Sequence, residues 1–324
     1  PPRRIGKIQC IKRGPGGTSL VTTAGTAIAA PSPTAKLPAP RPRLGLALGG
    51  GGARGLAHVV VLEAFDALGV KPDIISGTSI GAIYGAAYAA GLDARLIRAH
   101  TEEALSQRLD LMRQVLSSRP DPMAWFMRVL PVPPALLDPL ALLKALLPSS
   151  VPETFAGLKT PLRIVACDLY AQAPVVLDAG NLRAAMAASM TLPVLFAPIK
   201  VGGRVMVDGG LVNPLPFDVL LADCGITVAV DVSGGLPPDR NEADQGPSSL
   251  EVLSAASQIL QRSIVREKLR NKQPDLLLEC PVGAFSVIDF HRWKEVLAAA
   301  DPMRDSVKRQ IDRLLASETI EPQP

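Results

Sequence analysis

Histidine and cysteine are scarce in this chain of 324 residues, which contains three histidines and four cysteines. The cysteines are Cys10, Cys167, Cys224 and Cys280. They have no spacing typical of metal ligands, and three of the four lie in or beside apolar runs. They are interpreted as buried free thiols in a reducing compartment. The sequence therefore predicts no metal site, and no cofactor is expected.

A convincing transmembrane segment is also missing. Residues 74–92 form a run of nineteen residues without a charge, which is long enough to span a bilayer. Four glycines interrupt this run, and it contains the serine motif described below. It is therefore interpreted as a buried strand followed by a core helix.

Acidic residues are absent from the first part of the chain. Eight of the 34 lysines and arginines lie in residues 1–43, so the remainder has 26 basic against 30 acidic residues and a net charge of −4. This mildly acidic net charge argues against a nucleic-acid-binding body. Residues 1–41, rich in Pro, Gly and Ala, are predicted to be a disordered basic tail that anionic lipid would attract. Residues 42–324 are predicted to be one α/β domain.

The start of the chain bears on localisation. Its basic residues and the later Ala27-Ile28-Ala29 could be interpreted as an export signal, but residues 14–26 are too polar for the apolar region of such a signal. A cytoplasmic protein, with peripheral contact with a membrane, is predicted, and export is the alternative.

A G-x-S-x-G pattern, Gly77-Thr78-Ser79-Ile80-Gly81, follows the short apolar segment 73–76 and opens a helix of small residues over 82–88. This order of strand, turn and helix is the setting of a nucleophile elbow. Glycines on both sides of the serine permit a sharp turn, where a Cβ would crowd the strand or the helix. The pattern predicts a nucleophilic serine, although any glycine-rich turn between a strand and a helix can match it by chance.

A second glycine-rich turn, residues 49–52, lies about one βα unit upstream, after the apolar strand 44–48. Such a turn presents backbone N–H groups that can bind a negative charge. Gly50-x-Gly52-x-x-Gly55 matches the dinucleotide fingerprint, but the next strand runs into the serine motif instead of ending in an acidic residue. A P-loop is excluded because no Gly-Lys-Ser/Thr follows. An oxyanion hole for acyl transfer is the favoured interpretation.

A serine nucleophile needs a proton acceptor, and none of the three histidines lies at the end of a strand, where a Ser-His-Asp hydrolase has its histidine. His58 lies in the helix after the glycines, where packing or capping is expected. His100 lies in a charged helical stretch and is interpreted as solvated surface. His291 lies near the start of a late helix.

A carboxylate is the other candidate base. Asp208 ends an apolar strand at a two-glycine turn, which lets a backbone or substrate approach closely. Asp168 and Asp231 also end apolar runs, but an aspartate in this position most often caps a turn. Asp208 is favoured among the three.

Three segments together resemble the patatin-like phospholipase family, and its bacterial branch in particular. They are Gly50-Gly51-Gly52-Ala53-Arg54-Gly55, Gly77–Gly81 and Asp208-Gly209-Gly210. The resemblance extends over roughly residues 42–300, and includes segments just before and just after the aspartate strand. It implies a three-layer α/β/α fold with a central, mainly parallel sheet.

The resemblance also implies a Ser–Asp dyad without histidine, with Ser79 as nucleophile and Asp208 as general base. Backbone N–H groups around Gly50, Gly51 and Gly52 would form the oxyanion hole. Arg54 would steady that loop, although simple capping or a surface ion pair is an alternative for it. The flanking glycines of the three motifs would support the site: Gly55, Gly77, Gly81, Gly209 and Gly210.

The function implied by the resemblance is hydrolysis of lipid esters, by a phospholipase or a lysophospholipase/esterase, through an acyl-enzyme on Ser79. Two alternatives stay open: acyl transfer to an alcohol by the same residues, and a non-catalytic regulatory protein. The expected partner is a lipid ester substrate, with peripheral membrane contact and no nucleic acid.

The sequence also gives structural expectations for four further regions. Residues 109–152 contain Met, Trp, Phe and several prolines, and are interpreted as helical packing over the sheet, with a lid or acyl-chain channel as the alternative. Residues 248–272 and 304–315 are expected to be amphipathic outer helices, with a strand over 274–280 between them.

Overall fold

A computed structural model of the chain describes residues 42–117, 139–140, 143, 147–193, 195–234 and 249–318. The predicted tail, residues 1–41, lies outside the described residues, as do Cys10 and much of the segment 109–152. Among the described cysteines, Cys167 and Cys280 are buried free thiols, as predicted, and Cys224 is a half-buried one.

The described residues form an eight-stranded sheet in the order β5-β6-β3-β2-β1-β7-β8, with β4 also paired to β3. The strands are β1 Leu44–Leu48, β2 Ile74–Thr78, β3 Leu162–Asp168, β4 Ala173–Leu177, β5 Ile199–Val201, β6 Arg204–Asp208, β7 Ile226–Asp231 and β8 Leu276–Glu279. The pairs among β3, β2, β1, β7 and β8 are parallel, whereas β4, β5 and β6 pair antiparallel. The predicted mainly parallel sheet is confirmed.

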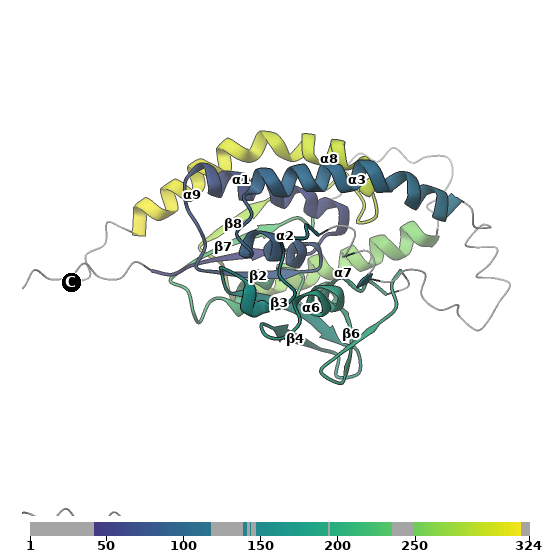
Figure 1. Cartoon of the computed structure of the whole chain (residues 1–324). Coiled ribbons are helices and arrows are strands. Elements are labelled where there is room, and N and C mark those ends of the chain that lie inside the picture. Colours follow the sequence, from purple (N-terminus) through teal and green to yellow (C-terminus); the bar gives the residue numbers. More distant parts are fainter. Residues whose placement is uncertain are drawn as a thin grey trace, which may run out of the picture. The chain divides into compact units, whose positions relative to one another are not determined.

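Helices cover both faces of this sheet (Figure 1). The α-helices are α1 His58–Ala67, α2 Ile80–Ala89, α3 Ala94–Ser117, α6 Leu182–Met190, α7 Ser249–Asn271, α8 Trp293–Ala300 and α9 Arg304–Glu318. Short 3-10 helices are η1 Gly52–Ala57, η2 Phe155–Gly157, η3 Gly209–Leu211, η4 Pro216–Val219, η5 Phe290–Arg292 and η6 Asp301–Met303. The outer helices and the late strand expected from the sequence are confirmed as α7, α9 and β8.

Alternation along the central strands explains why both faces need helices. In β1, Leu46 and Leu48 belong to the large core shared with α1, α2, α6, α8 and α9, whereas Ala47 belongs to a smaller core with Phe217 of η4 and Val265 of α7. A parallel strand buried on both faces reads as a continuous apolar run, as the sequence of β1 does. The three-layer α/β/α arrangement follows from this burial.

The uncharged run 74–92 forms β2 and α2, whose residues are buried in the core. Its interpretation as a strand plus a core helix is confirmed. None of the helices in the described ranges is long and apolar enough to cross a membrane.

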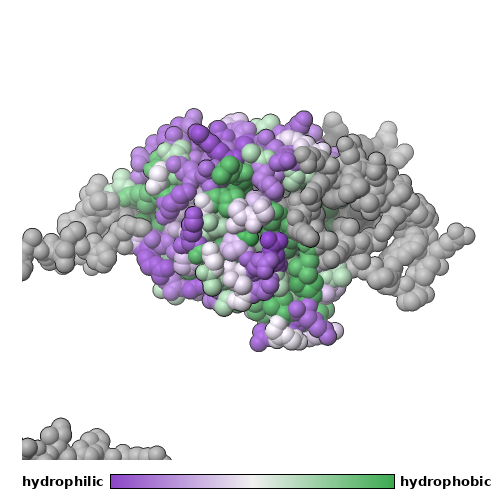
Figure 2. All heavy atoms as spheres, viewed as in Figure 1, coloured by the Kyte–Doolittle hydropathy of each residue, from purple (hydrophilic) through white to green (hydrophobic). Residues whose placement is uncertain are grey.

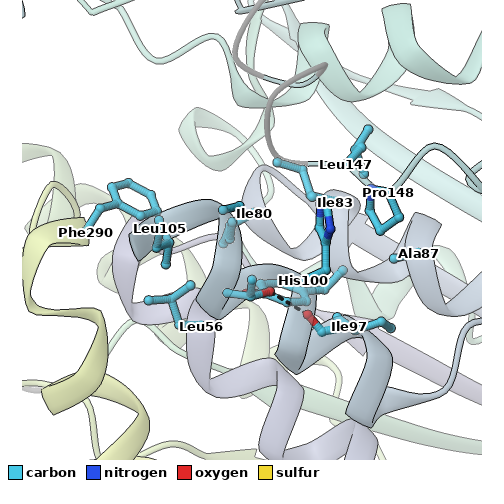
Figure 3. Close-up of a pocket in the computed structure, with 13 residues that line it drawn as sticks. Leu56, Ile80, Ile83, Ala87, Ile97, His100, Leu105, Leu147, Pro148 and Phe290 are labelled. Carbon is cyan, nitrogen blue, oxygen red and sulfur yellow. Dashed lines mark hydrogen bonds between the residues drawn. The ribbon is translucent and has the colours of Figure 1, made fainter. Parts of the chain in front are cut away.

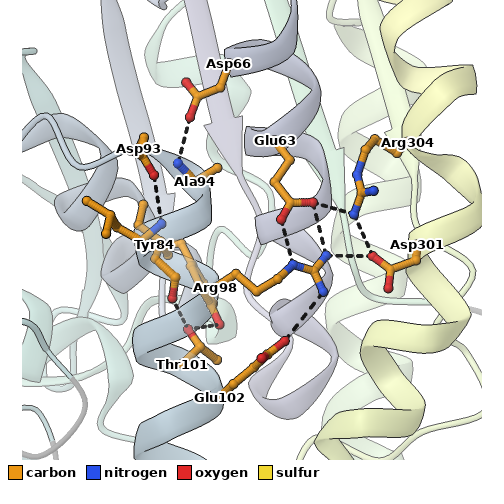
Figure 4. A network of polar contacts seen from close by, with 12 residues as sticks. Glu63, Asp66, Tyr84, Asp93, Ala94, Arg98, Thr101, Glu102, Asp301 and Arg304 are labelled. Atoms are coloured by element: carbon orange, nitrogen blue, oxygen red, sulfur yellow. Dashed lines mark hydrogen bonds and ion pairs between the residues drawn. The ribbon is translucent and has the colours of Figure 1, made fainter.

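A network of ion pairs joins the helices on the large-core side (Figure 4). Glu63 of α1 accepts from Arg98 of α3 at 2.6 Å, and Arg98 also donates to Asp301 of η6 at 2.6 Å. Arg304 of α9 pairs with the second oxygen of Glu63 at 2.5 Å. The Glu63 and Arg98 side chains are only 12 % and 18 % exposed, so solvent screens these pairs less than ordinary surface pairs. The network holds α3 against α1.

Candidate active site

Ser79 lies at a strained turn between β2 and α2. Its backbone has φ 54° and ψ −122°, a conformation that residues with a side chain rarely adopt. A Cβ at Gly77 would lie 2.6 Å from the Cα of Ala82, and one at Gly81 would lie 2.2 Å from the Leu48 carbonyl oxygen. Both glycines of the motif are therefore required by close backbone approach. The turn has the geometry of a nucleophile elbow.

The hydroxyl of Ser79 donates a hydrogen bond of 2.8 Å to Oδ2 of Asp208. Strand β3 brings the two residues together, because Thr78 pairs with its Val165 and Asp208 pairs with the next residue, Ala166. Strand β4 occupies the opposite edge of β3, so β2 and β6 follow one another along the same edge. The carboxyl ends of β2 and β6 therefore meet, one with the serine and the other with the aspartate.

Asp208 is 5 % exposed, and this burial raises its pKa from 3.8 to about 6. Two hydrogen bonds act against the shift: Gly210 N–H donates to Oδ1 at 2.7 Å, and Ser79 donates to Oδ2. A Cβ at Gly209 would lie 2.1 Å from the Val165 carbonyl oxygen, so the aspartate can approach β3 only with glycine after it. The result is a fixed carboxyl group that ionises near neutral pH.

The backbone of the elbow is held by a residue that the sequence did not single out. Ser79 N–H donates to Oγ of Ser189 at 2.7 Å, and Ser189 donates in turn to the Val165 carbonyl at 2.6 Å. Ser189 is fully buried on the otherwise apolar face of α6. A buried serine among alanines and methionines was the available signal, but its partner depends on tertiary structure.

The glycine loop lies against the serine. A Cβ at Gly50 would lie 3.5 Å from the Cβ of Ser79. The Gly50 N–H already donates to the Pro214 carbonyl at 2.8 Å. The amides of Gly51 and Gly52 have no hydrogen-bond acceptor within the described ranges, so these two remain free to bind an oxyanion. Of the three amides predicted as oxyanion donors, the Gly50 N–H is therefore already engaged by a carbonyl group.

Arg54 is 1 % exposed and links the glycine loop to the segment after β7. Its Nη1 donates to the Ser233 carbonyl, and its Nε donates to the Gly51 carbonyl at 3.4 Å. Burial lowers its pKa to about 10, and the nearby Asp231 opposes that shift. The alternative of a surface ion pair is excluded by this burial, and the contacts are those of a residue that supports the loop.

The Ser79 hydroxyl donates to Asp208 and not to a histidine. His58 is fully buried, its Nε2 lies 2.8 Å from the Gly49 carbonyl oxygen, and burial lowers its pKa to about 4. It is therefore neutral and packs under the glycine loop, as the sequence suggested. His291 is exposed in η5. The interpretation of His100 as solvated surface was wrong: it is half-buried, because it lies on the inner face of the amphipathic helix α3.

The two competing aspartates stabilise turns, as expected. Oδ1 of Asp168 accepts from the N–H groups of Tyr170 and Ala171 at 3.1 and 3.0 Å. Asp231 accepts from both the N–H and the hydroxyl of Ser233. Neither carboxylate bonds to Ser79.

The segment Asn213–Pro216 connects the parts of the site. Its carbonyl groups accept three hydrogen bonds of 2.8 Å: from the Thr78 hydroxyl to Asn213, from the Gly50 N–H to Pro214, and from the Ser76 hydroxyl to Pro216. One irregular segment thereby fixes the glycine loop relative to the strand that carries the serine.

Lys268 of α7 holds this segment from behind. Its ammonium group donates to the side chain of Asn213, to the Leu215 carbonyl at 3.1 Å and to Asp218 at 2.6 Å. Burial lowers its pKa, while Asp218 opposes that shift.

Replacing Lys268 by methionine leaves these partners unsatisfied, and we expect Lys268→Met to lower the free energy of unfolding by roughly 1–3 kcal/mol. Urea denaturation measures the change. Lys272→Met removes an exposed lysine one turn further on, and serves as the matched control, with an expected change within about 0.5 kcal/mol. Equal effects of the two substitutions would contradict the role assigned to Lys268.

A mainly apolar pocket begins at the residue after the serine (Figure 3). Ile80 and Ile83 of α2 line one side, and His100 and Leu105 of α3 line another. Leu147 and Pro148 close part of it. Leu147 is 6 % exposed and belongs to the large core. Much of the segment 109–152 lies outside the described residues, so its interpretation as helical packing stays a prediction, with the lid or acyl-chain channel as the alternative.

The described residues form an α/β fold in which the Ser79 hydroxyl is paired with the Asp208 carboxylate. Residues 46–221, more than half of the chain, match the family model described as patatin-like phospholipase. The chain therefore belongs to the patatin-like phospholipase family, which confirms the resemblance found in the sequence. At the level of the family, this supports lipid hydrolase activity.

Individual relatives are distant. An uncharacterised NTE family protein of Mycobacterium tuberculosis is 27% identical over 77% of this chain and 87% of its own length. Patatin-like phospholipase domain-containing protein 6 of Mus musculus is 31% identical over 57% of this chain, which corresponds to 13% of that protein. Among solved structures, VipD from Legionella pneumophila is similar with a TM-score of 0.44 and 15% identity, over 84% of this chain and 67% of that one.

Proposed function

We propose that the protein hydrolyses carboxylic esters of lipids through an acyl-enzyme formed on Ser79, with Asp208 as the general base. The observation that carries the proposal is the 2.8 Å hydrogen bond between a serine at positive φ and a buried aspartate whose pKa is raised to about 6. A base with a pKa just below the working pH accepts a proton efficiently and is still mostly ionised.

The reaction follows from the positions of the groups. Oδ2 of Asp208 takes the hydroxyl proton while Oγ of Ser79 attacks the ester carbonyl carbon. The N–H groups of Gly51 and Gly52 stabilise the oxyanion, and the N-terminus of α2, which begins at Ile80, adds a positive potential at the same place. The leaving alcohol takes the proton from Asp208, and water then hydrolyses the acyl-enzyme through the same base.

The substrate class follows from the pocket beside the serine. Its lining residues are mainly apolar and come from α2 and α3, so it suits the acyl chain of a lipid better than a polar substrate. All the groups named here lie in residues 42–324, which we take as the catalytic domain. Hydrolysis of a nitrophenyl ester and of phospholipid vesicles, with release of free fatty acid, tests the proposal. Failure to turn over any ester would contradict it.

The ratio kcat/KM for a nitrophenyl ester should depend on pH with an apparent pKa of about 6, the value to which burial raises Asp208. Only the ionised carboxylate can accept the serine proton, so activity is present above this pKa and is lost as the pH falls through it. Initial rates at subsaturating substrate, with circular dichroism at each pH to show that the protein stays folded, measure the profile. A rate that stays level from pH 8 down to pH 5 (roughly tenfold below half-ionisation) would show that another group is the base.

A further inference from the structure

One aromatic and one aliphatic side chain are exposed at the turn between β3 and β4. Tyr170 is 80 % exposed and Leu169 is 39 % exposed. The turn is rigid, because the buried Asp168 accepts from two of its N–H groups and Gln172 N–H donates to the Asp168 carbonyl at 2.9 Å. Gln172 has φ 53°, which is strained for a residue other than glycine. Reversal of the chain does not require exposed tyrosine and leucine side chains, so this fixed turn has a feature that its role in the fold does not explain.

A second tip lies beside this turn. Strands β5 and β6 form a hairpin whose turn residues, Gly202 and Gly203, have φ 58° and 80°, as a tight two-residue hairpin turn requires. Leu169 N–H donates to the Val205 carbonyl at 2.9 Å, which places the two tips next to each other. The Arg204 side chain is 60 % exposed and lies 3.9 Å from Asp168. We call residues 169–174 and 200–204 together the hairpin tips.

The hairpin tips project from the end of the sheet at which the parallel strands finish, and the candidate active site lies at the same end. Asp208 pairs with Ala166, and β6 runs outward from there to Arg204, four residues away. Four strand residues span about 13 Å. The carboxyl ends of β1 and β2, with the glycine loop and Ser79, lie at the same end of the sheet. A flat surface that touches the tips therefore lies close to the entrance of the site.

The chemistry of the hairpin tips is that of an interfacial anchor. Their residues include Lys200, Arg204, Leu169 and Tyr170 and no acidic residue, whereas the chain after residue 43 has 26 basic and 30 acidic residues. Tyrosine favours the boundary between lipid and water, and lysine and arginine are attracted to anionic headgroups. Figure 2 shows hydrophobic and hydrophilic spheres side by side at the lower end of the molecule, where Figure 1 labels β4 and β6.

We propose that the hairpin tips are a docking surface for a lipid bilayer with anionic headgroups, which orients the chain so that Ser79 faces the bilayer. The acidic body is repelled by such a surface, and a local basic tip then sets the orientation. The delivery of substrate to Ser79 rests on the proposed function, whereas the docking itself does not.

Vesicle binding by the full chain tests the docking, with Ser79→Ala in every variant so that the lipid is not consumed. Vesicles of phosphatidylcholine with and without phosphatidylglycerol are compared by co-sedimentation. We expect Tyr170→Ser and Lys200→Gln each to weaken binding to the anionic vesicles by about 5-fold or more. Leu96→Ser on α3, which removes a leucine that is 58 % exposed, is the matched control and should bind as the parent does. Residues 1–41 are present throughout, so they contribute equally to all variants.

A second readout reports on the tip itself. Tryptophan at position 170 (Tyr170→Trp) should add a blue-shifted emission on vesicle addition, measured as the difference from the parent spectrum, whereas Leu96→Trp should not. With Ser79 intact, Tyr170→Ser should hydrolyse a soluble nitrophenyl ester as the wild type does and lose activity on anionic vesicles.

Three results would overturn the docking surface. They are unchanged vesicle binding in both tip variants, an equal spectral shift at positions 96 and 170, and a loss of binding with Leu260→Ser on α7, also exposed (64 %), but not with Tyr170→Ser. Vesicle binding that depends on the tips, combined with no ester turnover by the wild type, would instead reject the proposed function and leave the docking surface standing.

Discussion

Ser79→Ala should abolish ester hydrolysis, with kcat/KM lower by about 10³-fold or more, as expected when the nucleophile of a covalent mechanism is removed. Oγ is the only non-hydrogen atom lost, and Ser79 N–H keeps its bond to Ser189. The glycine loop and Asp208 are not touched by the change. The residual rate then reports what the oxyanion donors and substrate binding achieve without a nucleophile.

Two controls separate chemistry from folding in this experiment. Ser79→Gly should be equally inactive but more stable than Ser79→Ala, because glycine adopts φ 54° without strain. Ser106→Ala removes an exposed serine on α3 and should keep full activity. An active Ser79→Ala enzyme would reject Ser79 as the nucleophile.

Asp208→Asn should lower kcat/KM by about 10³- to 10⁴-fold, because an amide cannot accept the serine proton. The asparagine oxygen can still accept from Gly210 N–H, so the turn after β6 is retained. Asp168→Asn changes a carboxylate of the neighbouring strand that accepts from its own turn, lies 3.9 Å from Arg204 and makes no hydrogen bond to Ser79, and should remain active. Turnover by Asp208→Asn at the wild-type rate would reject Asp208 as the general base, and the histidines, beginning with His58, would then be tested for this role.

Asp208→Asn should also change the free energy of unfolding in a way that depends on pH. Burial raises the pKa of Asp208 from 3.8 to about 6, so its protonation stabilises the folded state as the pH falls from 6 towards 4. Above pH 6 the buried charge destabilises the fold relative to a neutral side chain. Asp208→Asn should therefore raise the free energy of unfolding by about 1–3 kcal/mol at pH 8, and the gain should disappear near pH 4. Thermal melts at both values measure it, and a variant less stable at pH 8 would contradict the burial argument.

Glycine patterns explain why the elbow could be predicted from the sequence. A Cβ would collide with backbone at each of Gly77, Gly81 and Gly209. The residue type at these positions therefore indicates the local backbone conformation. Asp208 was recognisable for a related reason, since the two glycines after this strand end allow a backbone or substrate to approach closely. The resemblance to a known family added the pairing of this aspartate with the serine.

Contacts that depend on strand register and helix orientation could not be predicted. The meeting of β2 and β6 along one edge of β3, the Ser189 bond to the elbow and the Lys268 bonds to the segment 213–216 join residues between 53 and 129 positions apart. The engagement of the Gly50 amide by Pro214 also depends on such a contact. His100 was misjudged because charged neighbours on α3 masked its position on the inner face of that helix.

The central claim is that Ser79 carries the acyl group during turnover, and covalent labelling tests it most directly. A fluorophosphonate should form one bond from phosphorus to Oγ of Ser79 with loss of fluoride, while Asp208 takes the proton. The account predicts a single adduct per chain, mapped by peptide mass spectrometry to the peptide with Ser79, with loss of ester turnover in proportion. An adduct on another residue, or full turnover after Ser79 is modified, would contradict it.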